Sequence, residues 1–231
     1  MRRLLTAGIV ALALIALTAG AVYGSLPGVG DAPARVAAIV HSHGGRLAHV
    51  SPRTRVARAT VAIEDRRFWE HGAIDPIAVG RVLFDSVFHP GVDPGGSTIA
   101  QQLAKVLYDE PATAVGRLKA IGLAFKLEQR YSKARILGMY LNAIYYGHGF
   151  WGVGNASRGY FGRSVDRLSW SQAALLAGLP QAPSLLDPFR HANAARDRRK
   201  AVLHELVTTG TLPSTRAQAV AAAPLSIRAR N

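Results

Sequence analysis

The 231-residue chain contains no cysteine and only half as many acidic as basic residues. Without cysteine it can form neither a disulfide nor a thiolate metal site, and it has no thiol nucleophile. The 28 Lys and Arg against 14 Asp and Glu leave a net charge of +14. Such an excess favours an anionic partner, such as nucleic acid, anionic lipid or a phosphorylated substrate. A coding bias towards Arg and Ala would explain part of the same excess.

Charge is also missing from the N-terminal stretch that follows Arg2 and Arg3. The uncharged run 4–23 has the length of a bilayer-spanning helix and exceeds the apolar region of a cleaved signal peptide. We therefore expect residues 1–24 to form a transmembrane anchor, although Ala19-Gly20-Ala21 also fits a cleavage site. Two arginines ahead of the span place the N-terminus in the cytoplasm and the remaining chain outside, which argues against a nucleic-acid partner.

Stretches that alternate with period two are scarce, so the remaining chain is expected to be mainly α. Gly and Pro in 25–34 indicate a linker, and we predict a linker over 25–45, one domain over 46–212 and a loosely packed tail over 213–231. Residues 45–51 could form one short strand. The apolar segment 82–88 fits either a core helix or a surface that dips into the lipid interface. Helical periodicity predicts helices over Arg53–His71, Thr98–Tyr108, Ala114–Tyr131, Lys133–Tyr146, Ser171–Gly178 and Ala192–Thr209.

One carboxylate occupies an unusual place in the first expected helix, Arg53–His71. On a helix, Val61, Glu64, Phe68 and His71 share one face. Glu64 would then lie beside apolar side chains, where desolvation raises the pKa of a carboxyl. This suits a general acid or base, but a structural glutamate paired with an arginine explains the spacing equally well.

The stretch "GGSTIAQQLAK", Gly95–Lys105, has glycines followed by two good N-cap residues, Ser97 and Thr98. Thr98, Gln102 and Lys105 would share one helix face. A helix N-terminus preceded by glycines attracts phosphate through free N–H groups and the helix dipole. An ordinary capped amphipathic helix is the simpler alternative. The spacing of a P-loop is absent.

A third region, 116–142, combines apolar and cationic residues. Leu118, Ile121 and Phe125 predict a buried stripe. The surrounding cations usually form a solvated helix face, of which a pyrophosphate substrate would use one or two. The eight histidines show no convincing metal-ligand spacing, so we predict no metal site built from protein ligands.

Taken in order, these blocks resemble the peptidoglycan glycosyltransferases of family 51, and most closely the short monofunctional biosynthetic transglycosylases. The family motif EDxxFxxH is matched by Glu64, Asp65, Phe68 and His71, and GGSTxxQQLxK by Gly95–Lys105. Further matches, which extend the resemblance over roughly 49–210, are Tyr131–Asn142, Gly147–Val153, Tyr160–Gly162 and Ala174–Ser184.

The resemblance implies a lysozyme-like helical lobe with a smaller membrane-contacting jaw. It implies polymerisation of lipid II into glycan strands, with release of undecaprenyl pyrophosphate and Glu64 as the general base. A divalent cation, Mg or Mn, would be bound through the substrate pyrophosphate. The protein would lie in the bacterial cytoplasmic membrane with its catalytic domain on the periplasmic side, near other cell-wall synthesis proteins. The residues expected to bind lipid II and the nascent glycan are Asp65, Phe68, His71, Gly96, Ser97, Thr98, Gln102, Lys105, Arg117 and Lys119.

Three acidic residues of the family pattern are missing. The glutamate of the family's RKxxE motif aligns with Ala120 or Ile121, and two others align with Gly138 and Gln172. Either the chain is a divergent active enzyme, in which Glu128 partly compensates, or it is a degenerate member that binds lipid II or glycan without efficient polymerisation. A lytic hydrolase is a third alternative, but it would need a second carboxylate across the bond from Glu64.

Overall fold

The computed structural model describes residues 17, 20–80, 96–111 and 113–228. Within these ranges the protein is mainly helical, as predicted, and its only β-type pairing is an isolated bridge between Tyr145 and Trp151. Residues 20–25 and 76–80 are also helical. The named helices are α2 (Ala32–Ser42), α3 (Arg55–Glu64), α5 (Ile99–Tyr108), α6 (Ala114–Arg130), α7 (Lys133–Ala143), α8 (Val153–Phe161), α9 (Trp170–Gly178), α10 (Ala192–Thr208) and α11 (Ser214–Ala222).

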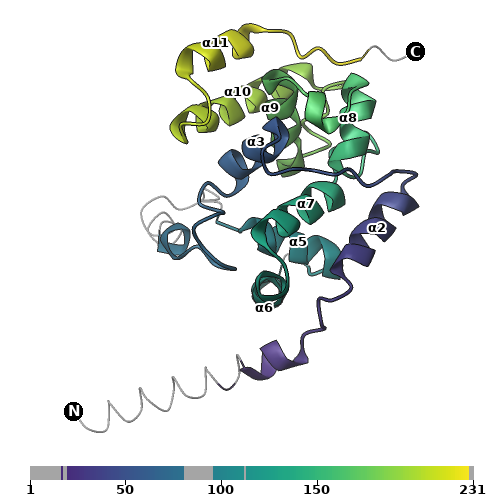
Figure 1. Ribbon diagram of the computed structural model, residues 1–231, viewed down its shortest axis with the longest axis vertical. Helices are drawn as coiled ribbons and strands as arrows, with labels where there is room; N and C mark the ends of the chain where they lie inside the picture. Colours follow the sequence, from purple (N-terminus) through teal and green to yellow (C-terminus); the bar gives the residue numbers. More distant parts are fainter. Residues whose placement is uncertain (1–16, 18–19, 81–95, 112, 229–231) are drawn as a thin grey trace, which may run out of the picture.

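The helices form two groups, one with α3, α8, α9, α10 and α11 and the other with α2, α5, α6 and α7 (Figure 1). In the first group α9 is central. All of its residues except Ser171 are buried, as expected for a helix that is apolar on every side. It packs against both α3 and α10. Alanines at the α3–α9 contact, including Ala59 and Ala174, allow the two helices to approach closely.

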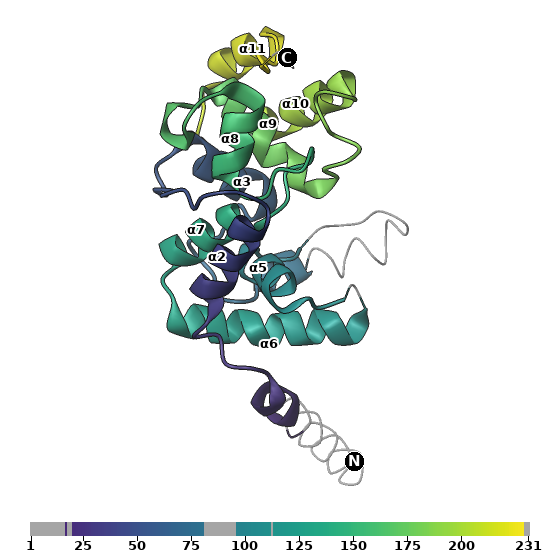
Figure 2. The same cartoon turned by 90° about the vertical axis from the view of Figure 1, so that its right-hand side faces the viewer.

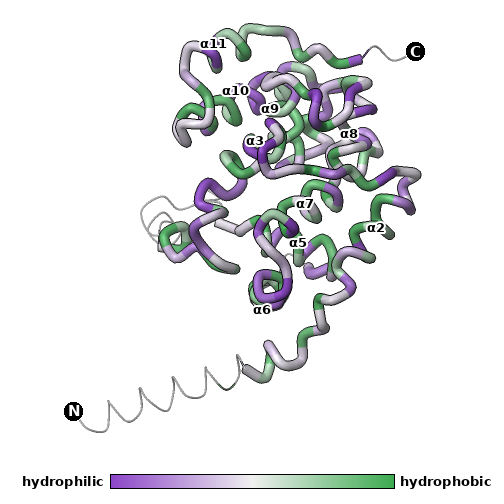
Figure 3. The backbone as a smooth tube through the Cα atoms, in the orientation of Figure 1, coloured by the Kyte–Doolittle hydropathy of each residue, from purple (hydrophilic) through white to green (hydrophobic). Residues whose placement is uncertain are grey.

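In the second group α5 packs against α6 and α7, and α2 packs against α7. Hydrophobic and hydrophilic residues alternate along most of the helices (Figure 3), so each helix contributes one face to a shared core.

Five of the named helices begin at a side-chain cap, which accepts a hydrogen bond from a backbone N–H of the first turn. The capping residues are Thr54, Thr98, Thr113, Ser132 and Ser169.

The predicted linker over 25–45 is wrong for its second half, because α2 occupies Ala32–Ser42. Its Val36 and Val40 are buried, and Val36 belongs to the main core cluster. The Gly and Pro residues of 25–34 precede the helix or lie in its first turn, where proline is tolerated.

Most of the predicted anchor, 1–24, lies outside the described residues, as does the apolar segment 82–88. No described helix combines the length and hydropathy needed to cross a bilayer.

The predicted loose tail over 213–231 is also wrong as far as 228. It contains α11, which packs against α10. The buried guanidinium of Arg199 donates hydrogen bonds to the carbonyl oxygens of Ala221, Ala223 and Pro224, at 2.9, 2.7 and 3.2 Å. These bonds hold the end of α11 against the domain, and Leu225 completes the contact in the main core.

Residues 45–51 do not form the predicted strand. The backbone of Ala48 instead exchanges two hydrogen bonds with the side-chain amide of Asn142, at 2.8 and 3.0 Å. A side chain on α7 thus supplies the pairing that a neighbouring strand would otherwise provide.

The predicted buried stripe on α6 is wrong in its orientation. Leu118 and Phe125 are 64% and 41% exposed, and Val115 is 63% exposed. The buried face consists instead of Gly116, Ala120, Leu123, Ala124 and Leu127. Periodicity identifies an apolar face on each side of such a helix, but only the packing of α5 determines which side is covered.

Candidate active site

Glu64 is the last residue of α3, and the helix predicted to continue to His71 ends there. Asp65 follows with φ −159°, outside the helical region. Turns then lead through 66–70. Phe68 and His71 therefore reach the site from a loop and not, as predicted, from the same helix face as Glu64.

Glu64 lies in an open cleft of about 360 Å³ that is also lined by Gly96, Ser97, Ile77 and Glu205. Its carboxylate is half-buried, and the Oε2 oxygen accepts a hydrogen bond from Nε2 of Gln102 at 2.9 Å. Burial raises the pKa of the Glu64 carboxyl. The hydrogen bond from Gln102 and the positive charge of Arg198 act in the opposite direction. A carboxylate with a raised pKa, open to a cleft, suits proton transfer.

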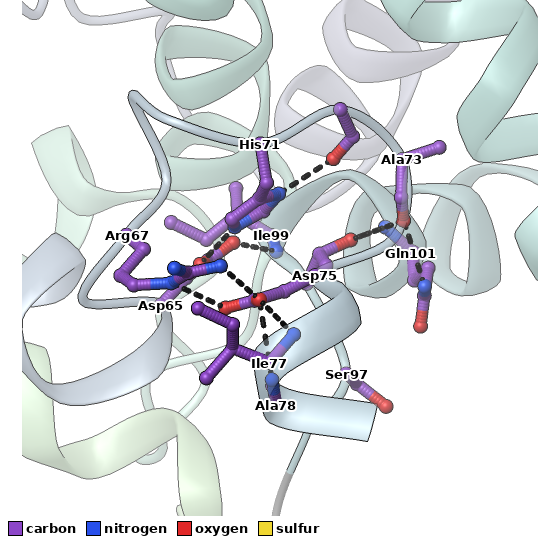
Figure 4. Close-up of polar contacts among 12 residues, drawn as sticks. Asp65, Arg67, His71, Ala73, Asp75, Ile77, Ala78, Ser97, Ile99 and Gln101 are labelled. Carbon is purple, nitrogen blue, oxygen red and sulfur yellow. Dashed lines mark hydrogen bonds and ion pairs between the residues drawn. The ribbon is translucent and has the colours of Figure 1, made fainter. Parts of the chain in front are cut away.

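Asp65 joins the first motif to the second. One carboxylate oxygen lies 2.6 Å from Nε2 of His71, and the other accepts the backbone N–H of Ile99 at 3.0 Å (Figure 4). The two side chains are only 3% and 4% exposed. The second ring nitrogen of His71 faces the carbonyl of Gly72 at 2.7 Å. Both ring nitrogens thus face oxygen atoms of the protein, and these contacts fix the orientation of the imidazole.

Thr98 was predicted to bind substrate, but its hydroxyl is committed within the fold. Thr98 is buried, donates to the carbonyl of Ala73 at 3.1 Å and accepts from the N–H of Gln101 at 3.2 Å. The predicted phosphate site at the N-terminus of α5 is therefore largely filled by protein groups. Asp65 accepts one N–H group and Thr98 another, so the carboxylate of Asp65 occupies the anion position.

The other predicted residues of the second motif line the cleft or face it. Gly96 has φ +123°, a left-handed conformation that favours glycine. Nζ of Lys105 lies 3.3 Å from Oγ of Ser97. Gln102 and Lys105 therefore reach the region of Glu64 and Ser97 from one face of α5, as predicted.

Phe68 is fully buried. The ammonium of Lys133 lies 4.4 Å from the centre of its ring and forms an ion pair with Glu128 at 2.8 Å. Phe68 is thus a packing residue of the loop. Glu128, which could have compensated for the missing motif acid, instead forms its ion pair with Lys133.

Arg117 and Lys119 are exposed on α6. Neither side chain forms a hydrogen bond or ion pair with another residue in the part of the chain that the structure describes. No contact in that part brings them to Glu64, so their predicted role in substrate binding stays a prediction.

Asp75 adds a third ligand-type group beside Asp65 and His71, and the potential ligand atoms of the three lie within 4.8 Å of one another. No spacing of these residues in the sequence indicates this group. Arg67 donates to both oxygens of Asp75, and the N–H groups of Ile77 and Ala78 donate to Oδ1 (Figure 4). Protein donors thus account for the positions of these side chains.

Two residues that were not predicted as site residues, Tyr140 and Arg198, lie near Glu64. The hydroxyl of Tyr140 donates to Oε1 of Gln102 at 2.8 Å. Arg198 on α10 interacts electrostatically with Glu64, and its Nε donates to the carbonyl of Gly178 at 3.2 Å. Gly178 makes room for Arg198, since a Cβ there would lie 2.8 Å from its Cγ. These partners are distant in sequence, so no local pattern indicated them.

The three positions at which the family has an acid and this chain does not lie in different surroundings. Gln172 forms a reciprocal capping box with Ser169 at the start of α9, a role that glutamine performs as well as glutamate. Gly138 borders open space. Ala120 is fully buried on the inner face of α6.

Comparison with known proteins identifies the family to which the chain belongs. A family model described as "Transglycosylase" matches residues 42–207. This chain belongs to the transglycosylase family. The match includes the whole cleft around Glu64, and it confirms the resemblance found in the motifs.

Relatives of this transglycosylase are longer proteins. It is 40% identical over 177 residues to penicillin-binding protein 1A of Aquifex aeolicus, covering 76% of this chain and 24% of that protein. It is 35% identical over 225 residues to penicillin-binding protein 1A of Escherichia coli, covering 87% and 26%. A crystal structure of penicillin-binding protein 1A from Haemophilus influenzae shares 32% identity over 43% of this chain and 15% of that chain, with a TM-score of 0.41. The transglycosylase thus spans about a quarter of the length of the curated relatives it matches.

Proposed function

We propose that the protein is a peptidoglycan glycosyltransferase that polymerises lipid II, with Glu64 as the general base. Membership of the transglycosylase family supports the reaction class. The observation that carries the role of Glu64 is its position, half-buried and open to the cleft, with a raised pKa and one oxygen held by Gln102.

In the proposed reaction Glu64 removes the proton from the 4-hydroxyl of the acceptor sugar as that oxygen attacks the anomeric carbon of the donor. The bond from this carbon to the pyrophosphate breaks, and undecaprenyl pyrophosphate leaves with the bonding electrons. The ammonium of Lys105, near Ser97 at the cleft, would stabilise the charge on the leaving group. A divalent cation, if required, would be bound through the pyrophosphate itself.

We further propose that α6 lies against the membrane surface. Its exposed apolar side chains Val115, Leu118 and Phe125 stand beside the exposed cations Arg117 and Lys119, a pattern that suits an interface with anionic lipid headgroups. Residues 20–26 lie on this side of the domain, at the end opposite α11 (Figure 2). Contacts between Tyr23 and Gln129 and between Lys126 and Leu26 connect them to α6.

The second candidate function is binding of lipid II or glycan without efficient polymerisation. The observation that favours it is that neither Ala120, which is buried, nor Ile121 carries an acid at the position of the family glutamate. The one acidic residue of α6, Glu128, forms an ion pair with Lys133 and does not replace the missing acid.

A polymerisation assay distinguishes the two functions. The full-length protein in detergent is given labelled lipid II, and glycan length is measured on a gel. We expect polymer from the wild type and a loss of about 100-fold or more in Glu64→Gln, as is typical when a general base is removed. Glu70→Gln, an exposed glutamate on the neighbouring turn, should retain full activity. Binding of lipid II without any polymer would favour the second function, and undiminished polymer from Glu64→Gln would refute the role of Glu64.

A further inference from the structure

Three helices contribute to a chain of two hydrogen bonds that ends at the proposed base. Tyr140 on α7 donates its hydroxyl proton to Oε1 of Gln102 on α5, at 2.8 Å. Nε2 of Gln102 then donates to Oε2 of Glu64, at the end of α3, at 2.9 Å. Tyr140 is 1% exposed, so its hydroxyl has no access to bulk water as an alternative partner.

The amide of Gln102 has one accepting end and one donating end, and Tyr140 holds the accepting end at 2.8 Å, whereas the carbonyl of Ser97 offers the donating end only a long contact of 3.5 Å. Burial raises the pKa of the Tyr140 phenol well above its ordinary value, and the charge of Glu64 adds to the effect. The phenol therefore remains a donor at neutral pH. With its carbonyl oxygen held by Tyr140, the amide presents N–H to Glu64. The reversed amide would place a carbonyl oxygen against an ionised carboxylate, which is repulsive.

The two oxygens of Glu64 are consequently not equivalent. Oε2 accepts from Gln102, whereas Oε1 accepts no hydrogen bond from any residue in the described ranges. Glu64 also lines the cleft, so Oε1 is the oxygen left for a substrate.

We propose that Tyr140 is a positioning residue, which acts through Gln102 to reserve Oε1 of Glu64 as the atom that receives the acceptor proton. This inference rests on the proposed function of Glu64 as the base. In the reaction the acceptor O–H bond breaks, its proton forms a bond to Oε1, and the hydrogen bond from Gln102 to Oε2 persists.

Several charged or titratable groups face Glu64 and set its proton affinity together. Asp65 adjoins it in sequence, Arg198 approaches from α10, and the buried phenols of Tyr140 and Tyr146 lie on the α7 side. Removing the Tyr140 hydroxyl leaves the other three groups in place. Its effect on Glu64 should therefore come through the amide of Gln102 alone.

The test compares Tyr140→Phe with Tyr160→Phe in the full-length protein. Tyr160 is an equally buried phenol whose hydroxyl donates to the backbone oxygen of Tyr146 at 3.0 Å, without contact to Gln102. In Tyr140→Phe the amide can reverse, so Glu64 loses part of a hydrogen bond that favours its ionised form. The acidic limb of the polymerisation pH profile should move to higher pH by about half a unit to one unit. Tyr160→Phe should keep the wild-type profile.

A purely structural role of Tyr140 would lower the rate at every pH without moving the limb, and that result would overturn the proposal. A second readout requires no activity: the side-chain carboxyl carbon of Glu64, assigned by its loss in Glu64→Gln, is titrated by ¹³C NMR. The pKa of Glu64 measured in this titration should rise by the same amount in Tyr140→Phe. An inactive wild type would refute the proposed function, while an unshifted carboxyl titration would refute the role of Tyr140. Should Tyr140→Phe not fold, Gln102→Ala removes the same donor and must give the upward shift.

Discussion

Asp65 and His71 form a buried pair in which Oδ1 and Nε2 lie 2.6 Å apart. The other oxygen of Asp65 accepts the N–H of Ile99, the first residue of α5. The pair therefore fastens the loop after Glu64 to the helix that carries Gln102. Two of the family's motif residues thus set the position of the base, and Asp65 also lines the cleft beside it.

Removing the charge of Asp65 should destabilise the protein. Asp65→Asn replaces one of the two acceptor oxygens that hold His71 and Ile99 by an N–H2 group, and disturbing these buried hydrogen bonds costs about 1–3 kcal/mol. Urea unfolding at neutral pH measures the loss in free energy of unfolding. Asp109→Asn is the matched control, because Asp109 is exposed at the end of α5 with φ +51°, a conformation that asparagine tolerates. Equal stability of the two variants would contradict a structural role for Asp65.

Glu64 should lower the stability of the protein when it ionises. Burial raises its pKa above the ordinary 4.5, so its contribution to stability is complete below pH 4.5 and is lost as the pH rises through the raised value. Glu64→Gln mimics the protonated form. The variant should be more stable than the wild type at pH 8, and the difference should vanish near pH 4. Urea unfolding at both values, with the exposed Glu70→Gln as control, checks this, and a destabilised Glu64→Gln at pH 8 would contradict it.

Thr98 should matter for stability more than for substrate affinity. Thr98→Val removes the cap of α5 and the buried hydrogen bond to Ala73, for an expected loss of about 1–2 kcal/mol. Thr98→Ser keeps both bonds and should remain close to the wild type. Thermal unfolding measures the stability, and KM for lipid II measures the affinity. A raised KM in Thr98→Val at unchanged stability would instead support direct substrate binding.

The proposed membrane face of α6 can be located with a tryptophan probe. Leu118→Trp in nanodiscs with brominated lipids should gain fluorescence that the lipids quench, because the indole would lie at the acyl boundary. Leu185→Trp is the comparison, since Leu185 is 70% exposed and follows α9, whereas α6 packs against α5 and α7. The wild-type signal of three tryptophans is subtracted in both cases. Equal quenching of the two added probes would show that α6 does not face the lipid.

The candidate site was predictable where its signals are local. The cap at Thr98 and the helix that follows it appear in the sequence as a hydroxyl residue before an amphipathic run, and the structure confirms α5 within one residue. The structure brings Gln102 to Glu64 and Lys105 to Ser97, while the roles predicted for Glu64, Gln102 and Lys105 stay predictions. Tyr140 and Arg198 were not predicted, because their contacts with Gln102 and Glu64 connect residues at least 38 positions apart.

By itself the sequence determined the helical class, the family, and the bounds of α5, α6, α9 and α10 to within one residue, because periodicity, capping and motif spacing are properties of short segments. Only the tertiary structure decided where α3 ends, since Asp65 leaves the helix to bond His71 and Ile99. It also decided that 32–42 and 214–222 pack as helices, and which side of α6 is covered. Each of these outcomes depends on long-range partners that compensate the backbone or bury one face, and a local pattern carries no information about such partners.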